Sequence, residues 1–227
     1  GSAGERCMAI SAVLAVGDDT ADRFVSALAP KVRALKIGQY DEPGVEMGPV
    51  ITRESKERVT DYINQGEADG AKVVVDGRGL SLQGYEGGFF VGGTLLDHVT
   101  ADMSVYRDEI FGPVLSVLRP KTYEEAVNLV MTHEYGNGTA IFTRDGDAAR
   151  EFANNVNVGM VGVNVPIPVP VAYHSFGGWK ASMFGDHSIH GMEGVRFYTK
   201  LKTVTARWPS GIKDGAVFNF HSGSETK

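Results

Sequence analysis

The sequence contains a single cysteine, Cys7, among 227 residues. An internal disulfide needs two cysteines, so no disulfide framework holds this fold, and the composition is typical of a reducing compartment. No apolar run approaches the roughly 20 residues of a membrane-spanning helix. Lys and Arg form no cluster, and the formal net charge is -6. We therefore expect neither a membrane nor a nucleic acid as a partner.

Complete motifs for nucleotides and metals are also missing. No G-x-G-x-x-G stands between a predicted strand and a predicted helix, and HSFGGWKAS (174–182) lacks the glycine spacing of a phosphate-binding loop. Of the six histidines, His187 and His190 are three apart, without Cys or carboxylate partners at ligand spacing. We expect no metal site and no complete nucleotide site within this chain.

The N-terminus carries no targeting signal, because a basic segment followed by an apolar run is absent. It also has no initiator Met, and residues 1–4 lead directly into the segment around Cys7. We therefore expect either a fragment of a longer protein or a cloning remnant at the first residues.

Apolar runs and amphipathic segments alternate through the middle of the chain. The spacing of apolar residues predicts helices from Asp18, from Thr52 and from Thr122, with Pro30 interrupting or kinking the first. The remaining expected elements are strands in 8–17, 72–77, 114–118, 138–143 and 159–165, a helix over 147–156, and a hairpin or strand pair within 80–99. Alternation of this kind favours an α/β fold with a mostly parallel sheet flanked by helices.

The last part of the chain has a different pattern. Residues 197–208, FYTKLKTVTARW, alternate residue by residue between two faces. A long strand with a polar face outside the main core is typical of pairing with another segment or subunit. We therefore predict that residues 197–208 pair outside the main core and that a tail begins at Pro209.

Cys7 is the candidate nucleophile, although a lone cysteine is more often a small buried apolar residue. The small residues at 2–4 allow the backbone to approach a substrate closely. Arg6 is either a solvated charge or a group that stabilises a thiolate or holds an anion. A Cys–His acyl-transfer pair with His174 also remains open at this point.

Several motifs occur in a characteristic order: GERC (4–7), GP (48–49), EIFGP (109–113), YGNGTAIFT (135–143), FGGWK (176–180), FYT (197–199) and KTVT (202–205). Together they resemble the C-terminal half of the NAD-dependent aldehyde dehydrogenases, from Gly1 to about Trp208. Within that superfamily, GSAGERCMA (1–9), VGVNVPIPVP (161–170) and SFGGWKAS (175–182) resemble the CoA-acylating methylmalonate-semialdehyde dehydrogenase family. The resemblance implies an aldehyde dehydrogenase catalytic domain over 1–194, a bridging strand over 195–208 that serves oligomerisation, and a C-terminal tail over 209–227.

That family oxidises malonate or methylmalonate semialdehyde with NAD and CoA, and releases acetyl-CoA or propionyl-CoA and carbon dioxide. Valine, β-alanine and inositol breakdown use such an enzyme. The resemblance implies the same reaction here, a homodimer or homotetramer, and a bacterial cytoplasm or, in a eukaryote, the mitochondrial matrix.

The resemblance also assigns roles to individual residues. Cys7 matches the nucleophile that forms a thioester, and its backbone N–H matches one donor of the oxyanion hole. Arg6 would bind the substrate carboxylate. Glu109 would bond the nicotinamide ribose, and Phe111 would pack at the nicotinamide end. Phe176, together with residues 166–170, would line the substrate entrance, whereas Lys180 is expected to be structural.

Two features depart from the family pattern. Gly92-Gly93-Thr94 stands where relatives read Gly-Pro-Thr, which we expect to loosen one turn. The family also places its Rossmann-like cofactor domain, and the second oxyanion donor, before the nucleophile. We therefore expect the isolated chain to bind NAD weakly and not to turn over alone.

Three other functions compete with this prediction. A hydrolytic NAD(P)-dependent enzyme, for example one acting on succinate semialdehyde, would resolve the thioester with water. A Cys–His hydrolase or acyltransferase would work without NAD. A non-enzymatic assembly module would act through the strand predicted from Phe197.

Overall fold

The computed structural model describes residues 2–208. In chain order the elements are η1 (Ser2–Gly4), β1 (Ala12–Leu14), α1 (Asp18–Arg33), α2 (Arg53–Ala68), β2 (Lys72–Val75), β3 (Thr94–Asp97), α3 (Ser104–Arg107), β4 (Val114–Leu118), α4 (Tyr123–Thr132), β5 (Tyr135–Gly136), β6 (Gly138–Ile141), α5 (Gly146–Asn155), β7 (Met160–Val163), β8 (Trp179–Lys180) and α6 (Met192–Tyr198).

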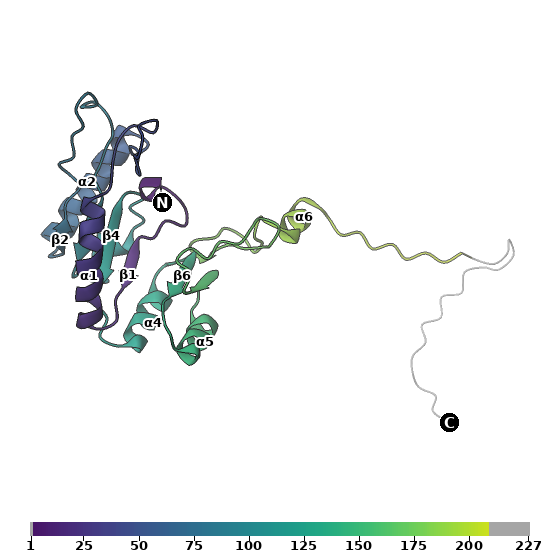
Figure 1. The fold of residues 1–227 in the computed structure, drawn as a ribbon. Coiled ribbons are helices and arrows are strands. Elements are labelled where there is room, and N and C mark those ends of the chain that lie inside the picture. The colour runs from purple at the N-terminus through teal and green to yellow at the C-terminus, as the bar shows by residue number, and fades with distance from the viewer. Residues whose placement is uncertain (1, 209–227) are drawn as a thin grey trace.

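The main sheet has four strands in the order β1-β4-β3-β2. Strand β4 pairs in parallel with both β1 and β3, and β2 is antiparallel at the edge. Helices cover both faces, with α1 on one side and α2 with α3 on the other (Figure 1). This confirms the predicted α/β fold with a mostly parallel sheet.

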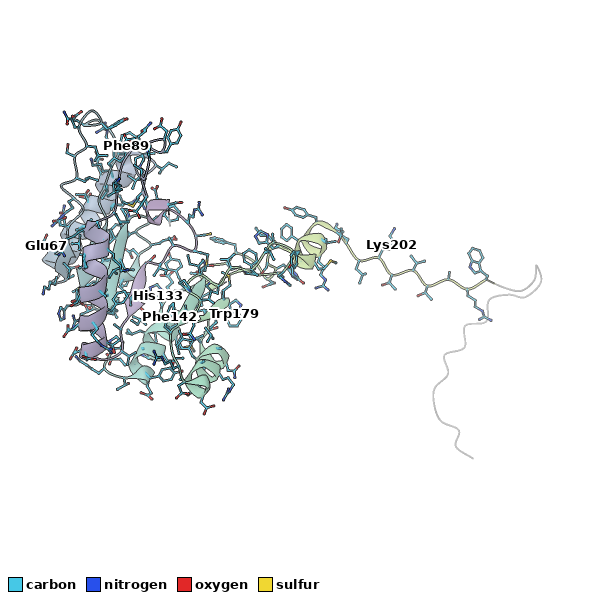
Figure 2. All side chains as sticks on the ribbon, in the orientation of Figure 1. Glu67, Phe89, His133, Phe142, Trp179 and Lys202 are labelled. Atoms are coloured by element: carbon cyan, nitrogen blue, oxygen red, sulfur yellow. The ribbon has the colours of Figure 1, made fainter. Side chains whose placement is uncertain are left out.

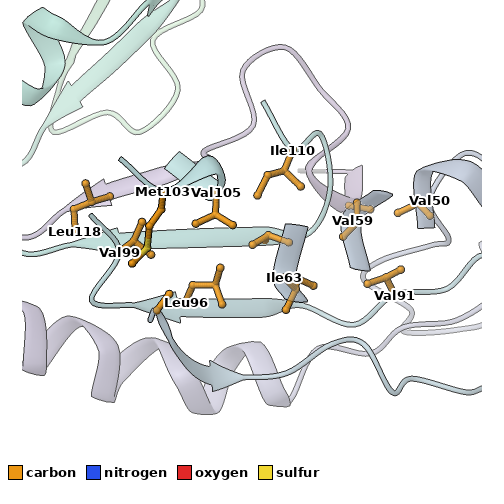
Figure 3. Close-up of a cluster of buried hydrophobic side chains, with 13 residues drawn as sticks. Val50, Val59, Ile63, Val91, Leu96, Val99, Met103, Val105, Ile110 and Leu118 are labelled. Atoms are coloured by element: carbon orange, nitrogen blue, oxygen red, sulfur yellow. The ribbon is translucent and has the colours of Figure 1, made fainter. Parts of the chain in front are cut away.

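Successive strand residues point to opposite faces of this sheet and so belong to different apolar clusters. Leu96 packs with Val59 and Ile63 of α2 (Figure 3). Its neighbour Leu95 packs instead with Ala21 of α1. Leu95 and Leu96 are both completely buried. The two clusters therefore fix the sheet between its helices, because a shift of one residue would exchange the faces.

Two of the predicted helix starts are confirmed by their caps. The Thr52 side chain accepts a hydrogen bond from the Ser55 N–H, at 3.1 Å. The Thr122 side chain accepts one from the Glu125 N–H, at 3.2 Å. Glu125 in turn accepts from the Lys121 N–H, which is one residue outside the usual capping-box partner.

Helix α1 begins at Asp18, as predicted, with Gly17 as its N-cap. It continues through Pro30 to Arg33, so Pro30 does not interrupt it. Pro30 lies in the last turn, where few helical bonds remain to be lost. The predicted strand pair within 80–99 is a single strand, β3, after a long loop. Phe90 and Val91 of this loop are nevertheless buried. They contribute to the hydrophobic core without pairing in a β-sheet.

A second, smaller unit follows β4. Strands β6 and β7 pair in parallel, connected by α5. Phe152 of α5 and Val158 are buried against residues of α4. Strand β5 pairs antiparallel with β8. This unit carries the YGNGT segment, which contacts Cys7 and Met8, as described below.

The predicted bridging strand is only partly extended. Phe197 and Tyr198 lie in α6, which corrects the prediction of a strand from Phe197. Residues 199–208 form no strand within the described part of the chain and run away from the body of the molecule (Figures 1 and 2). Leu201 and Trp208 are 97% and 90% exposed. The predicted tail, 209–227, lies outside the described residues.

A buried ion pair joins the ends of two core strands. Asp97 accepts two bonds from Arg119, at 2.9 and 2.7 Å. Burial alone would raise the pKa of Asp97, but the bonds from Arg119 and from the His98 N–H outweigh it and hold that pKa below its usual range. A lowered pKa in the folded state means that the pair stabilises the fold at neutral pH and that this contribution is lost as the pH falls through the folded-state pKa.

Candidate active site

The segment before Cys7 has an unusual backbone. Ser2, Ala3 and Gly4 have φ angles of 49, 56 and 75°. A side chain is rarely found in this left-handed region outside glycine, and such residues cluster at functional sites. The Glu5 N–H donates to the Ser2 carbonyl at 3.0 Å and closes this turn. The chain then delivers Cys7 on a loop that ends where β1 begins.

The N-terminal side of the loop is braced against the EIFGP segment. Gly4 lies so close to Gly112 that a Cβ on Gly4 would overlap the Gly112 carbonyl oxygen. The Glu5 carboxylate accepts a hydrogen bond from the Ile51 N–H at 3.2 Å. Ala3 is buried between these contacts. Glycine is therefore required at residue 4 for two reasons, its positive φ and the close approach.

The C-terminal side of the loop is held by another motif. The Asn137 side-chain amide donates to the Cys7 carbonyl at 2.8 Å. The same amide lies 3.2 Å from the Met8 sulfur. The GERC and YGNGT motifs therefore meet in space, although 130 residues separate Asn137 from Cys7.

Cys7 itself is a free, exposed thiol. The Ala9 N–H donates to the Arg6 carbonyl at 2.9 Å, so Cys7 occupies the corner of a turn. Within residues 2–208, no acceptor takes the Cys7 N–H and no histidine bonds the thiol. The Arg6 guanidinium is exposed and likewise has no ion-pair partner among these residues. Thiol, N–H and guanidinium are thus all available to a ligand.

The predicted cofactor residues lie on the neighbouring loop between α3 and β4. Phe111 is half-buried with a φ of 53°, and Glu109 is exposed. Phe111 lines an open hollow together with residues before Cys7 and residues around Pro49; the other lining residues are Ser2, Ala3, Glu5, Gly48, Pro49 and Ile51. The structure therefore brings Phe111 to the Cys7 loop.

Other predicted residues are not brought to Cys7 by any described contact. Phe176 stacks on His190, with ring centroids 4.3 Å apart. His174 lies against Tyr173, at 4.4 Å. No described contact therefore supports a Cys7–His174 pair, and the role of Phe176 stays a prediction.

Lys180 has the structural surroundings that the sequence suggested. Its ammonium donates to the carbonyls of Val130, Met131 and His133 at 3.0, 3.0 and 3.1 Å. Two of these carbonyls belong to the last turn of α4, where a cation is favoured. Burial lowers the pKa of Lys180. Lys180 thus joins β8 to the end of α4.

The histidine pair of the sequence analysis does not form part of a metal cluster in the described residues. His187 instead hydrogen-bonds Glu193 at 2.9 Å. Across the described residues, no group of three or more His, Cys, Asp or Glu side chains could hold a metal ion. In the same part of the chain, no helix combines the length and the apolar character needed to cross a bilayer.

Sequence reasoning missed two contributors to the loop, Asn137 and Gly112. Both were noted only as parts of motifs. A signal for Asn137 was present, since a polar residue between Gly136 and Gly138 is typical of close backbone approach. Nothing local to Gly112 indicated that Gly4 would be its partner.

The aldehyde dehydrogenase family model matches residues 1–204. The malonate-semialdehyde dehydrogenase of Pseudomonas aeruginosa is 58% identical over 92% of this chain and 42% of its own length. The bovine mitochondrial methylmalonate-semialdehyde/malonate-semialdehyde dehydrogenase, named as acylating, is 47% identical over 92% of this chain and 38% of its own length.

A solved structure also matches closely. The NAD complex of a methylmalonate-semialdehyde dehydrogenase from Sinorhizobium meliloti superposes with a TM-score of 0.92 at 61% identity, covering 94% of this chain and 44% of that one. The chain therefore spans less than half the length of the relatives it matches.

Proposed function

The chain belongs to the aldehyde dehydrogenase family, and we propose that it is the catalytic half of a CoA-acylating dehydrogenase of malonate or methylmalonate semialdehyde. The observation that carries this proposal is the Cys7 loop. An exposed thiol and an uncommitted N–H lie next to an exposed guanidinium, on a loop braced against the segment that contains Phe111.

Cys7 attacks the aldehyde carbon as a thiolate and forms a carbon–sulfur bond. The Cys7 N–H donates to the oxygen that becomes negative in this step. When bound, NAD accepts the hydride that leaves this carbon. A thioester then remains on Cys7. The substrate carboxylate is released as carbon dioxide, and the carbanion that remains beside the thioester carbonyl takes up a proton from water. The thiolate of CoA then attacks the thioester carbonyl, and the Cys7 thiolate leaves.

The residues present fit the cofactor. The exposed Glu109 carboxylate would accept hydrogen bonds from ribose hydroxyls, and the half-buried Phe111 ring would offer an apolar surface to nicotinamide. Both lie on the loop that contacts the Cys7 segment through Gly112. We propose that further NAD contacts come from residues outside this chain.

We also propose a homodimer or homotetramer for the complete protein, with residues 199–208 pairing with another copy. The exposed apolar side chains of this segment support the proposal, with Val204 76% and Trp208 90% exposed. The relatives at 58% and 61% identity come from bacteria, so we propose a bacterial cytoplasm as the compartment.

The acylating reaction is tested by following NADH in the longest reading frame that contains this chain. With malonate semialdehyde and NAD, we expect sustained turnover only when CoA is present, because the thioester on Cys7 needs a thiol acceptor. Equal turnover without CoA would instead assign the protein to the hydrolytic dehydrogenases.

Arg6→Leu is expected to lower kcat/KM for malonate semialdehyde about 10- to 100-fold, the equivalent of a lost charge-assisted hydrogen bond to the substrate carboxylate. For propionaldehyde, which lacks the carboxylate, kcat/KM should change less than about three-fold. Arg144→Leu is the control, since Arg144 is also exposed but lies on the loop between β6 and α5. Equal losses for both aldehydes would contradict the assigned role.

A further inference from the structure

We propose that Asn137 is a positioning residue for the Cys7 nucleophile, acting through the Cys7 carbonyl rather than through substrate. The effect on turnover rests on the proposed function, whereas the effect on the loop does not. Asn137 is the point at which the β5–β6 connection reaches the Cys7 loop, with an Nδ2–O distance of 2.8 Å.

The Cys7 carbonyl needs a partner from outside its own segment. The turn closed by Ala9 and Arg6 resembles the first turn of a helix. In a continuing helix, the N–H four residues later, that of Ser11, would take the Cys7 carbonyl. The chain instead extends into β1, and the Ser11 carbonyl accepts from the Ser116 N–H. The Asn137 amide supplies the missing donor and so ends the turn at Cys7.

Asn137 can serve as a fixed support because its own backbone is held on both sides. The Gly136 N–H donates to the Ser182 hydroxyl at 3.0 Å, and the Gly136 carbonyl accepts from the Gly159 N–H at 2.9 Å. On the other side, Gly138 begins β6 and pairs with Met160. The side chain therefore projects from a connection of one residue between two anchored strands.

The Asn137 side chain is also confined. A Cβ on Gly178 would lie 3.2 Å from the Asn137 Oδ1, so the amide oxygen faces the FGGWK segment while the nitrogen faces the Cys7 loop. A Cβ on Gly138 would approach the Met8 methyl to 2.9 Å, so Met8 fills the space beside the amide. Glycine at 138 and at 178 therefore leaves the space that Met8 and the Asn137 amide occupy.

Two supports therefore fix the Cys7 loop, the Gly4–Gly112 contact before the thiol and the Asn137 bond directly after it. Together they hold the thiol and the free Cys7 N–H in one arrangement. Reaction rates are sensitive to such placement, since a displacement of about 1 Å costs on the order of 100-fold. Asn137 acts on this placement and touches no described group that would bind the aldehyde.

The test uses Asn137→Asp, which keeps the side-chain shape but turns an acceptor toward the Cys7 carbonyl, and Asn137→Ser, which is too short to reach it. The control is Asn154→Asp, the same change on the exposed surface of α5. In the longest reading frame, we expect both Asn137 variants to lower kcat roughly 10- to 100-fold. The KM for the semialdehyde should stay within about three-fold of the parent value, because no binding contact is removed.

A second readout needs no enzymatic activity. Trypsin cleaves after Arg6, and such cleavage requires the loop to open locally. We expect both Asn137 variants to be cleaved there at least about five-fold faster than the parent and the Asn154 control, with unchanged cleavage after Arg144. If the parent forms no NADH, the proposed function fails and the cleavage rates still decide this inference. Parent-like cleavage after Arg6 in both Asn137 variants would overturn it, as would parent-like kcat in an active protein.

Discussion

Cys7→Ala is expected to abolish NADH formation from malonate semialdehyde, with a loss of at least about 10⁴-fold, as for removal of a nucleophile elsewhere. Cys7 is the only cysteine in the sequence, so no second thiol of this chain can take over. The side chain is exposed, and its replacement should change the free energy of unfolding by less than about 0.5 kcal/mol. Stopped-flow absorbance of NADH and a urea unfolding curve measure the two effects.

Ser11→Ala is the matched control for this variant. Ser11 is exposed and lies on the same segment between the Cys7 turn and β1, and it should keep the parent rate within about two-fold. A Cys7→Ala protein that retained more than about one per cent of the parent rate would show that the thiol is not the nucleophile.

Gly4→Ala is expected to lower kcat by roughly 100-fold or more and to destabilise the fold. An alanine at this position is unfavourable for two reasons, the positive φ of 75° and the overlap of its Cβ with the Gly112 carbonyl. Neither backbone can move without displacing the loops that carry Cys7 and Phe111. The left-handed conformation alone costs about 1–2 kcal/mol. Any larger decrease in the free energy of unfolding therefore measures the contact between the two loops.

Gly17→Ala separates these two contributions. Gly17 also has a positive φ, 83°, but a Cβ there would meet nothing within 4 Å. With a ψ of 145°, Gly17 has its own backbone conformation. Its alanine variant should show a backbone cost without any Cβ contact in urea unfolding, with kcat within about three-fold of the parent. Similar kcat values for the two variants would mean that the Gly4–Gly112 contact does not position the nucleophile.

The elements that could be predicted from sequence are those governed by local chemistry. Thr52 and Thr122 start helices because their side chains cap the first turn. The apolar run at 114–118 was predicted as a strand from its composition, and the structure buries it as β4 inside the sheet. In these cases the local pattern agrees with the packing of the fold.

The predictions that failed depended on partners elsewhere in the chain. Phe90 and Val91 are as apolar as strand residues, yet they are buried from a loop. The alternation that predicted a strand from Phe197 gives way to α6 at its start, and the described residues supply no strand to pair with the remainder. Tertiary packing, which a local pattern does not contain, decides both.

The candidate site shows the same division. Cys7 and Arg6 became candidates because they are adjacent in the sequence and because the ordered motifs resemble a known family, which assigns each a role that stays a prediction. Asn137 was not a candidate, because its function lies in a single bond to a carbonyl 130 residues away. The flanking glycines indicated a close approach but not its partner, which only the folded arrangement of the chain identifies.

The most direct test of the account is peptide mass spectrometry after a single turnover. The longest reading frame that contains this chain is mixed with NAD and malonate semialdehyde in the absence of CoA, quenched in acid and digested. The account predicts an acyl group on the peptide that contains Cys7, and its disappearance with formation of acyl-CoA when CoA is added before the quench. NADH formation with no acyl group on Cys7, or an acyl group that CoA does not remove, would contradict it.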